Sequence, residues 1–231
     1  MQISNTLETA EVVGKYNKLI LDAKLSDGKI VPVFCSCYDI FNICDIGTTI
    51  YISKREEHNF RIEYELELIA VNEQFIYAKP NRNNDLFEEA FSDGVLKEFS
   101  NFTDCYRLKS SDNLPHLDFE LSNPKGDKGY VFVTNIYQKQ GGVAVFPSEI
   151  NFFEFEMFEE MQQLRIQGYK TYVFMIVPRT DCHDIRFSWK LSPLAAGKIF
   201  EEAKNGINFI GYGCNINKMS VTLSHSMPIL Y

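Results

Sequence analysis

Asp118 is the residue of this chain whose setting most resembles part of a metal-dependent hydrolytic site. It lies in a strand-like segment at 115–121, and a turn at 122–129 joins that segment to a second one at 130–138. One large class of nucleases builds its Mg²⁺ site from such a strand pair, with an acid on the first strand and an acid and a lysine on the second. Phosphodiester hydrolysis needs two or more carboxylate oxygens around the ion, and usually a cation that orients the attacking water. The second segment, YVFVTNIYQ, contains no acid and no lysine, so Asp118 alone cannot hold Mg²⁺.

Two further acids lie close to Asp118 in the sequence. Glu120 shares its strand face but lies about 6 to 7 Å further along the strand, and Asp127 lies in the turn. A Mg²⁺-dependent nuclease with a site rebuilt around Asp118 is therefore an alternative, and Mg²⁺ is expected as a cofactor only in that case. The main interpretation is that Asp118 is a hydrogen-bonded structural acid and that the protein has no cofactor.

The elements that would position these residues fall into two regions. Up to about residue 85, short segments with alternating apolar residues are separated by turns, as in YNKLILDAKL, SDGK, IVPVFCSCY, DIGTT, TIYISK, YELELIAV and QFIYAKP. This pattern predicts a small antiparallel barrel of the OB type. We therefore expect an OB-like domain at 1–85 and a second domain at 86–231.

The second region mixes helices and strands. The segment 84–99 has helical spacing, and the run KTYVFMIVP is typical of a central strand covered on both faces. Ile150, Phe153, Met157, Met161 and Leu164 recur at helical intervals before Gly168, which predicts a helix with one buried face. A further helix should end at 205–206. The order indicates a layered α/β domain with a central sheet.

Composition indicates a folded acidic protein. The 231 residues are 45% hydrophobic and 14% aromatic, and the net charge is −8. Residues 1–85 and 86–231 each carry a net charge of −4, so neither region shows the excess of Lys and Arg that a phosphate-binding surface uses.

The N-terminal residues lack the basic start and apolar stretch of a signal peptide, and no apolar run is long enough to span a bilayer. We therefore expect a cytoplasmic protein that does not contact a membrane. Its six cysteines should be reduced thiols.

Several collinear segments resemble the sugar fermentation stimulation protein family (SfsA). They are KYNKLILDAKLSDGKIV, YELEL, AKPNRNN, GGVAVFPSE, VPRTD, LSPLAAGKIFEEAKNGI and SHSMPI, which extend from about Lys15 to Pro228. The resemblance implies an N-terminal OB-like domain and a C-terminal domain of the PD-(D/E)xK nuclease type. It also implies DNA binding and a role in regulating sugar metabolism, especially of maltose.

The site residues of that family are largely replaced here. Asp118 matches the acid of the first strand, but Phe132 falls at the family's glutamate and Thr134 at its lysine. In the segment FEFEMF, Phe153 falls at an arginine and Glu156 at a lysine. An early helix glutamate would fall near Arg107, or at Asp104 with a gap of one residue, and of the family's CPNTGxM loop only Cys35 persists.

The resemblance also directs attention to cations in the first region. The candidate nucleic-acid-binding residues are Lys15, Tyr16, Lys18, Lys54, Arg55, Arg61, Lys79 and Arg82. Domains of the OB type stack bases on aromatic rings beside a basic groove, so Tyr51, Tyr64 and Tyr77 are candidate stacking residues.

Three functional hypotheses follow. The leading one is a DNA-binding regulator without nuclease activity. The second is a protein-interaction pseudoenzyme that no longer binds DNA, which is motivated by the acidic charge and by Glu156. The third is the rebuilt nuclease. The sequence does not indicate an oligomeric state.

Overall fold

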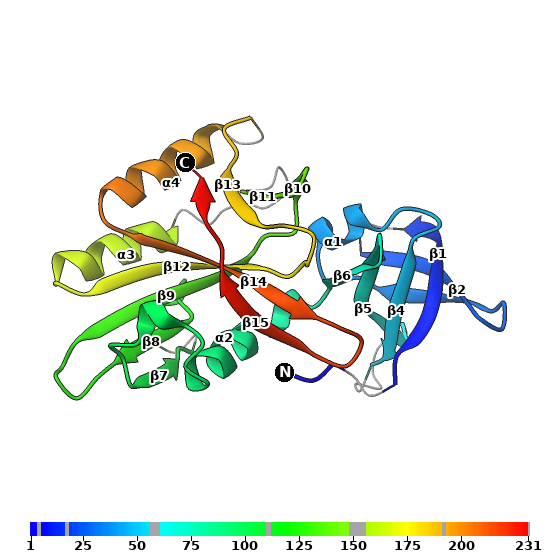
Figure 1. Ribbon diagram of the computed structural model, residues 1–231, viewed down its shortest axis with the longest axis horizontal. Helices are drawn as coiled ribbons and strands as arrows, with labels where there is room; N and C mark the ends of the chain where they lie inside the picture. The colour runs from blue at the N-terminus through cyan, green and yellow to red at the C-terminus, as the bar shows by residue number, and fades with distance from the viewer. Residues whose placement is uncertain are drawn as a thin grey trace. The chain divides into compact units, whose positions relative to one another are not determined.

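The computed structural model describes residues 1–3, 6–16, 19–55, 61–109, 112–147, 156–190 and 193–230. The chain divides into two compact units, whose elements are labelled in Figure 1. The first unit consists of residues 1–82, 178–181 and 214–222, and the second of residues 83–177, 182–213 and 223–231. The chain therefore passes between the two units several times.

The first unit is built on a six-stranded sheet in the order β3-β2-β1-β4-β5-β6, and an additional pairing of β3 with β5 closes five of these strands into a barrel. Alternate residues point inward, among them Leu21, Ala23, Val31 and Val33, which are at most 4% exposed. The elements are β1 (Glu8–Tyr16), β2 (Ile20–Leu25), β3 (Ile30–Phe34), α1 (Tyr38–Ile43), β4 (Thr49–Lys54), β5 (Tyr64–Val71), β6 (Gln74–Tyr77) and a 3₁₀ turn at Pro80–Arg82.

The third predicted strand is shorter than the sequence indicated. It ends at Phe34, and Tyr38 begins the short helix α1 instead of continuing the strand. The side chain of Ser36 donates a hydrogen bond to the Ala78 carbonyl at 2.8 Å, so this segment turns away from the strand ladder. The apolar run of the sequence did not reveal this turn.

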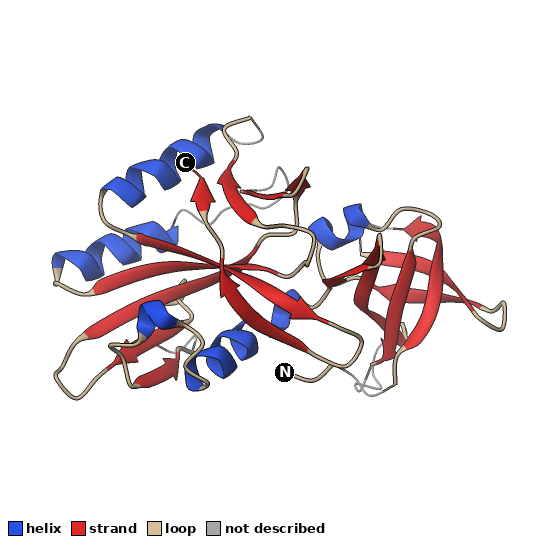
Figure 2. Cartoon of the chain, in the orientation of Figure 1, coloured by secondary structure: helices blue, strands red, loops and turns tan. Residues whose placement is uncertain are grey.

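The second unit contains a six-stranded sheet in the order β15-β14-β12-β9-β8-β7 and a four-stranded sheet in the order β10-β11-β13-β16. In the larger sheet β9, β12 and β14 are parallel, whereas β7, β8 and β9 are antiparallel (Figure 2). The elements are α2 (Asn83–Ser92), a 3₁₀ turn at Lys97–Phe99, β7 (Asp104–Arg107), β8 (Phe119–Ser122), β9 (Lys128–Asn135), β10 (Lys139–Gln140), β11 (Val143–Phe146), α3 (Glu156–Ile166), β12 (Lys170–Val177), β13 (Asp184–Phe187), α4 (Pro193–Lys204), β14 (Asn208–Ile216), β15 (Val221–Ser226) and β16 (Ile229–Leu230).

Strand β12 lies at the centre of the larger sheet, as its apolar sequence predicted, and residues 171–177 are all buried. Phe174 faces α2, where its ring centroid lies 4.9 Å from that of Phe87. Val173 and Met175 face the other way, into a core cluster that contains Met157 of α3 and Ile199 of α4. Helix α2 therefore covers one face of the sheet, and α3 and α4 cover the other.

The predicted helices are present where the structure describes them. Met157, Met161 and Leu164 form the buried face of α3, while the predicted members Ile150 and Phe153 lie outside the described residues. Helix α4 ends at Lys204, two residues before Gly206, whose φ of 95° is the left-handed conformation that favours glycine. The predicted fold class, an N-terminal barrel followed by an α/β domain, is confirmed.

Candidate functional site

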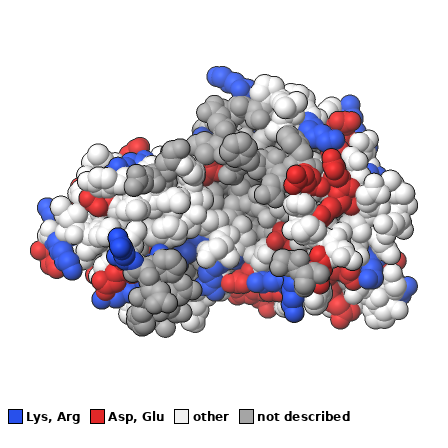
Figure 3. Space-filling model, turned by 180° about the vertical axis from the view of Figure 1, so that it is seen from behind, with Lys and Arg blue, Asp and Glu red and all other residues white. Residues whose placement is uncertain are grey.

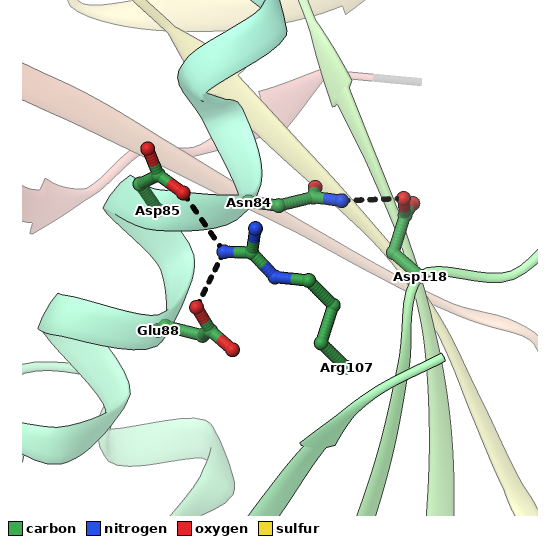
Figure 4. Close-up of polar contacts among 5 residues, drawn as sticks. All are labelled: Asn84, Asp85, Glu88, Arg107 and Asp118. Carbon is green, nitrogen blue, oxygen red and sulfur yellow. Dashed lines mark hydrogen bonds and ion pairs between the residues drawn. The ribbon is translucent and has the colours of Figure 1, made fainter. Parts of the chain in front are cut away.

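Asp118 lies at the point where the pairing of β8 and β9 ends. Its backbone N–H donates to the Val131 carbonyl at 2.9 Å, and the ladder begins at the next residue, Phe119. One side-chain oxygen, Oδ2, accepts the backbone N–H of Val133 at 2.7 Å. The other, Oδ1, accepts the side-chain amide of Asn84 at 2.8 Å (Figure 4). The carboxylate thus continues the hydrogen bonding of β9 and fastens the start of α2 to the sheet.

The surroundings of the Asp118 carboxyl change its pKa. Burial raises the pKa of Asp118, and the hydrogen bonds from Val133 and Asn84 and the charge of Arg107 oppose that shift without cancelling it. The pKa of Asp118 is therefore above its ordinary value. Such a carboxyl resists losing its proton more than an exposed one does.

Arg107 brings a positive charge to the same place. It lies on β7, and its guanidinium forms ion pairs with Asp85, at 2.9 Å, and with Glu88, both on α2 (Figure 4). Burial lowers the pKa of Arg107, but its bonds to the two acids outweigh that effect and the net shift is upward. A single cation thus pairs with both helical acids and offsets one of their two negative charges.

The prediction that a helix glutamate of the family falls near Arg107 or at Asp104 is wrong about the helix. Arg107 and Asp104 both lie on strand β7 and not on a helix, and Asp104 is exposed and accepts a hydrogen bond from Thr103. The helical acids beside Asp118 are Asp85 and Glu88, which the sequence reasoning missed. Their spacing of three residues at the start of a predicted helix was the signal that could have found them.

Phe132 and Thr134 lie on β9 and are both half-buried. Phe132 packs against the core cluster below α3, so an aromatic ring occupies the position where the resemblance expected a glutamate. The centre of β9 therefore carries no acid and no lysine.

The two other nearby acids also have partners. Glu120 accepts hydrogen bonds from Lys128 Nζ at 2.6 Å and from the Tyr130 hydroxyl at 2.9 Å. Asp127 accepts one from the Asn123 amide at 2.9 Å. Neither of these acids points its oxygens at Asp118 in the contacts described.

These residues do not fit a magnesium ion. Both oxygens of Asp118 already accept N–H groups, and the helical acids are paired with Arg107. In the part of the chain that the structure describes, no three His, Cys, Asp or Glu side chains gather in a way that could hold a metal. Mg²⁺ is usually held by one or two carboxylates together with water, and the carboxylates here are engaged by Asn84, Val133 and Arg107 instead.

Four of the predicted nucleic-acid-binding residues lie at the ends of two barrel strands. Lys15 and Tyr16 end β1, Lys54 ends β4, and Arg55 follows it. The pairing of β1 with β4 places Lys54 beside the start of β1, near Glu8, and so at the opposite end of this strand pair from Lys15. The guanidinium of Arg55 lies over the ring of Phe34 on β3, which shares one cross-strand row with Ile20 and Tyr16.

The other predicted cations are placed differently. Lys79 is 8% exposed and pairs with Glu65 and, at 3.2 Å, with Glu67, so it belongs to the interior and not to a binding surface. Arg61 is exposed, and Arg82 is half-buried at the end of the 3₁₀ turn. Lys18 lies outside the described residues.

The predicted stacking tyrosines are also interior. Tyr51, Tyr64 and Tyr77 are 9%, 6% and 1% exposed, so none of them presents a ring face to a base. Tyr51 alternates with the inward residues Ile50 and Ile52 and is covered on the other face by Phe75 and Lys218, so its burial comes from tertiary contacts that the sequence does not show. The prediction that these three rings stack bases is therefore wrong.

A protein-family match shows which family the chain belongs to. The model described as "Sugar fermentation stimulation protein RE domain" matches residues 81–220. The chain belongs to the sugar fermentation stimulation protein family. A homolog from Maricaulis maris is 24% identical over 231 residues, covering 99% of this chain and 98% of that one. Another, from Desulfotalea psychrophila, is 23% identical over 217 residues and covers 94% of this chain and 92% of its own.

A solved structure shows the same fold. "The structure of Pyrococcus Furiosus SfsA in complex with Ca2+" superposes with a TM-score of 0.84 and covers 100% of this chain and 98% of that one, at 14% identity. At this identity the likeness concerns the fold. It supports the SfsA arrangement of an N-terminal barrel and a C-terminal α/β domain.

Glu156, at the position of a lysine in the SfsA resemblance, begins helix α3. Its side chain is 73% exposed and lies 3.2 Å from Nε2 of His116, whose Nδ1 lies 2.7 Å from Glu160. Phe153, the other altered helix position, lies outside the described residues. The start of α3 therefore presents acidic side chains.

None of the helices in the described part of the chain combines the length and the apolar character that crossing a bilayer requires.

Proposed function

We propose that this member of the SfsA family is a DNA-binding regulatory protein, linked to sugar metabolism, that does not cleave DNA. The observation that supports it most is that two barrel cations lie over aromatic rings, Arg55 over Phe34 and Lys15 over Phe41. Phosphate contacts made by Lys and Arg supply most of the affinity of a protein for nucleic acid without regard to sequence.

Net charge alone is a poor guide to this surface. Both basic and acidic side chains lie on the face in Figure 3, where acidic ones form groups on the right-hand side, and the whole chain carries a charge of −8. Within the barrel, Glu63 is paired with Lys54 at 2.8 Å and Glu65 with Lys79. These acids repel phosphate less because each has a cation beside it.

The absence of cleavage is supported by the contacts of Asp118. Each oxygen of this carboxyl already accepts an N–H, from Asn84 on α2 and from Val133 on β9, which orients the group as part of the hydrogen bonding of the fold. The place of the metal-binding acid on β9 is taken by Phe132, and that of the lysine by Thr134. The rebuilt nuclease is the least supported of the three hypotheses.

The test is DNA binding by fluorescence anisotropy at several salt concentrations. The double variant Lys15→Ala, Arg55→Ala should bind more weakly, and the slope of log K against log salt should fall by about 1 for each phosphate that the variant no longer neutralises. Lys24→Ala, Lys29→Ala is the matched control, because both lysines are exposed on or beside β2, away from the row. If the wild-type protein does not bind DNA at low salt, the proposal fails.

A second candidate function is favoured by the acidic start of α3. Glu156 and Glu159 are exposed there, and Glu160 lies one residue further on. Such a surface suits a basic protein partner better than phosphate. A stable protein complex recovered by affinity purification, together with no DNA binding, would favour a protein-interaction pseudoenzyme.

A further inference from the structure

The outer surface of the barrel carries a row of apolar side chains that the sequence did not reveal. Tyr16, Ile20 and Phe34 are direct cross-strand partners on β1, β2 and β3. Tyr16 is 57% exposed, and Ile20 and Phe34 are half-buried. Because neighbouring strands are about 4.8 Å apart, Tyr16 and Phe34 are separated by roughly 10 Å.

A β-bulge explains why Tyr16 faces outward. The register shifts between Val12 and Gly14, so that Lys15 is the partner of the inward residue Leu21 and Tyr16 falls on the outer face. Without the extra residue, simple alternation from the buried Val12 would turn Tyr16 inward. Bulges re-aim side chains in this way, frequently at functional sites.

Cations lie on the aromatic rings at this end of the barrel. The Arg55 guanidinium lies 4.8 Å from the centroid of the Phe34 ring, and Lys15 Nζ lies 4.6 Å from that of Phe41 on α1. The backbone N–H of Arg55 donates to the Glu63 carbonyl at 2.8 Å, which fixes the start of that side chain. Each half-buried ring thus has a positive charge directly beside it.

We infer that this end of the barrel binds single-stranded nucleic acid in preference to duplex. The inference rests on the proposed function and names the form of its ligand. A ring face can stack only on an unpaired, unstacked base, whereas a duplex offers its phosphates but hides its base faces. Tyr16 supplies the exposed ring face, and Arg55, which lies over the half-buried Phe34 on the same outer row, is the cation placed to reach an adjoining phosphate.

The test compares a single strand of about 15 nucleotides, near the upper site size of one OB-type barrel, with the duplex of the same sequence. The wild-type protein should bind the single strand at least tenfold more tightly, by an order-of-magnitude stacking estimate. Tyr16→Ala should weaken single-strand binding by roughly tenfold and leave duplex binding unchanged, whereas Tyr16→Phe should retain the affinity.

Tyr106→Ala is the matched control, because Tyr106 is a 50% exposed tyrosine on β7 of the other unit, and it should bind as the wild type does. Circular dichroism and thermal unfolding verify that each variant is folded. Equal affinity for single strand and duplex, or an equal loss for both in Tyr16→Ala, overturns the inference while leaving the proposed function standing. Absence of binding to either DNA contradicts the proposed function itself.

Discussion

The side-chain amide of Asn84, at the start of α2, lies 2.8 Å from the carboxylate of Asp118, at the start of β8. This hydrogen bond joins a helix and a strand that are 34 residues apart in the sequence. Together with the bond from the Val133 N–H, it gives Asp118 a structural role.

Removing this acid should destabilise the protein. Asp118→Ala leaves the Val133 N–H and the Asn84 amide without their acceptor, which costs about 1–3 kcal/mol for a buried group. Urea unfolding measures the change. Asp104→Ala is the control, because Asp104 is exposed, and its unfolding free energy should change by less than about 0.5 kcal/mol. Equal stability of Asp118→Ala and the wild type would contradict the structural role.

The stabilising effect of Asp118 should depend on pH. Because its folded pKa is above the ordinary value of 3.8, the folded state binds the proton more tightly than the unfolded state does. The corresponding contribution is complete below the unfolded pKa and is lost as the pH rises through the folded pKa. The unfolding free energy of the wild type relative to Asp118→Asn should therefore fall as the pH rises above the ordinary pKa of 3.8. A difference that rises with pH there would show that the hydrogen bonds outweigh burial.

Arg107 should be coupled to the helical acids. Its guanidinium is 39% exposed, so its ion pair with Glu88 is screened by water, and a coupling of about 0.5–1 kcal/mol is expected. A double-mutant cycle of Arg107→Met and Glu88→Gln measures it by urea unfolding. The coupling should decrease in high salt. Additive effects of the two substitutions would show that the pair contributes nothing.

Lys79 and Lys54 form a matched comparison of an interior and an exposed ion pair. Lys79→Met leaves Glu67, which is 5% exposed, without its cation, and should destabilise the barrel by about 3 kcal/mol. Lys54→Met removes a pair whose side chains are 61% and 60% exposed, and should change stability by little. Thermal unfolding of the two variants gives the result. Similar melting temperatures would mean that the interior lysine is not required.

The sequence predicts more of the fold than of the candidate site. Alternating strands, the apolar run of β12 and the helical spacing of Met157, Met161 and Leu164 are local patterns, and the structure has these elements. The partner of Asp118 could not be predicted, because Asn84 reaches it only through the packing of α2 on the sheet.

The prediction of which tyrosines stack bases failed for a related reason. Tyr51, Tyr64 and Tyr77 fit the pattern of a strand equally well on either face, and the structure buries all three. Tyr16 faces outward only because of the bulge at Val12–Gly14, and the alternation of the sequence does not show that extra residue.

The most direct test of DNA binding without cleavage uses one end-labelled DNA sample. The protein is incubated with it at low salt in the presence of Mg²⁺ or Mn²⁺, and one portion is run on a native gel and another on a denaturing gel. The account predicts a retarded band on the native gel and full-length DNA on the denaturing gel. Unretarded DNA, or cleavage by the wild type that is lost in Asp118→Ala, would contradict it.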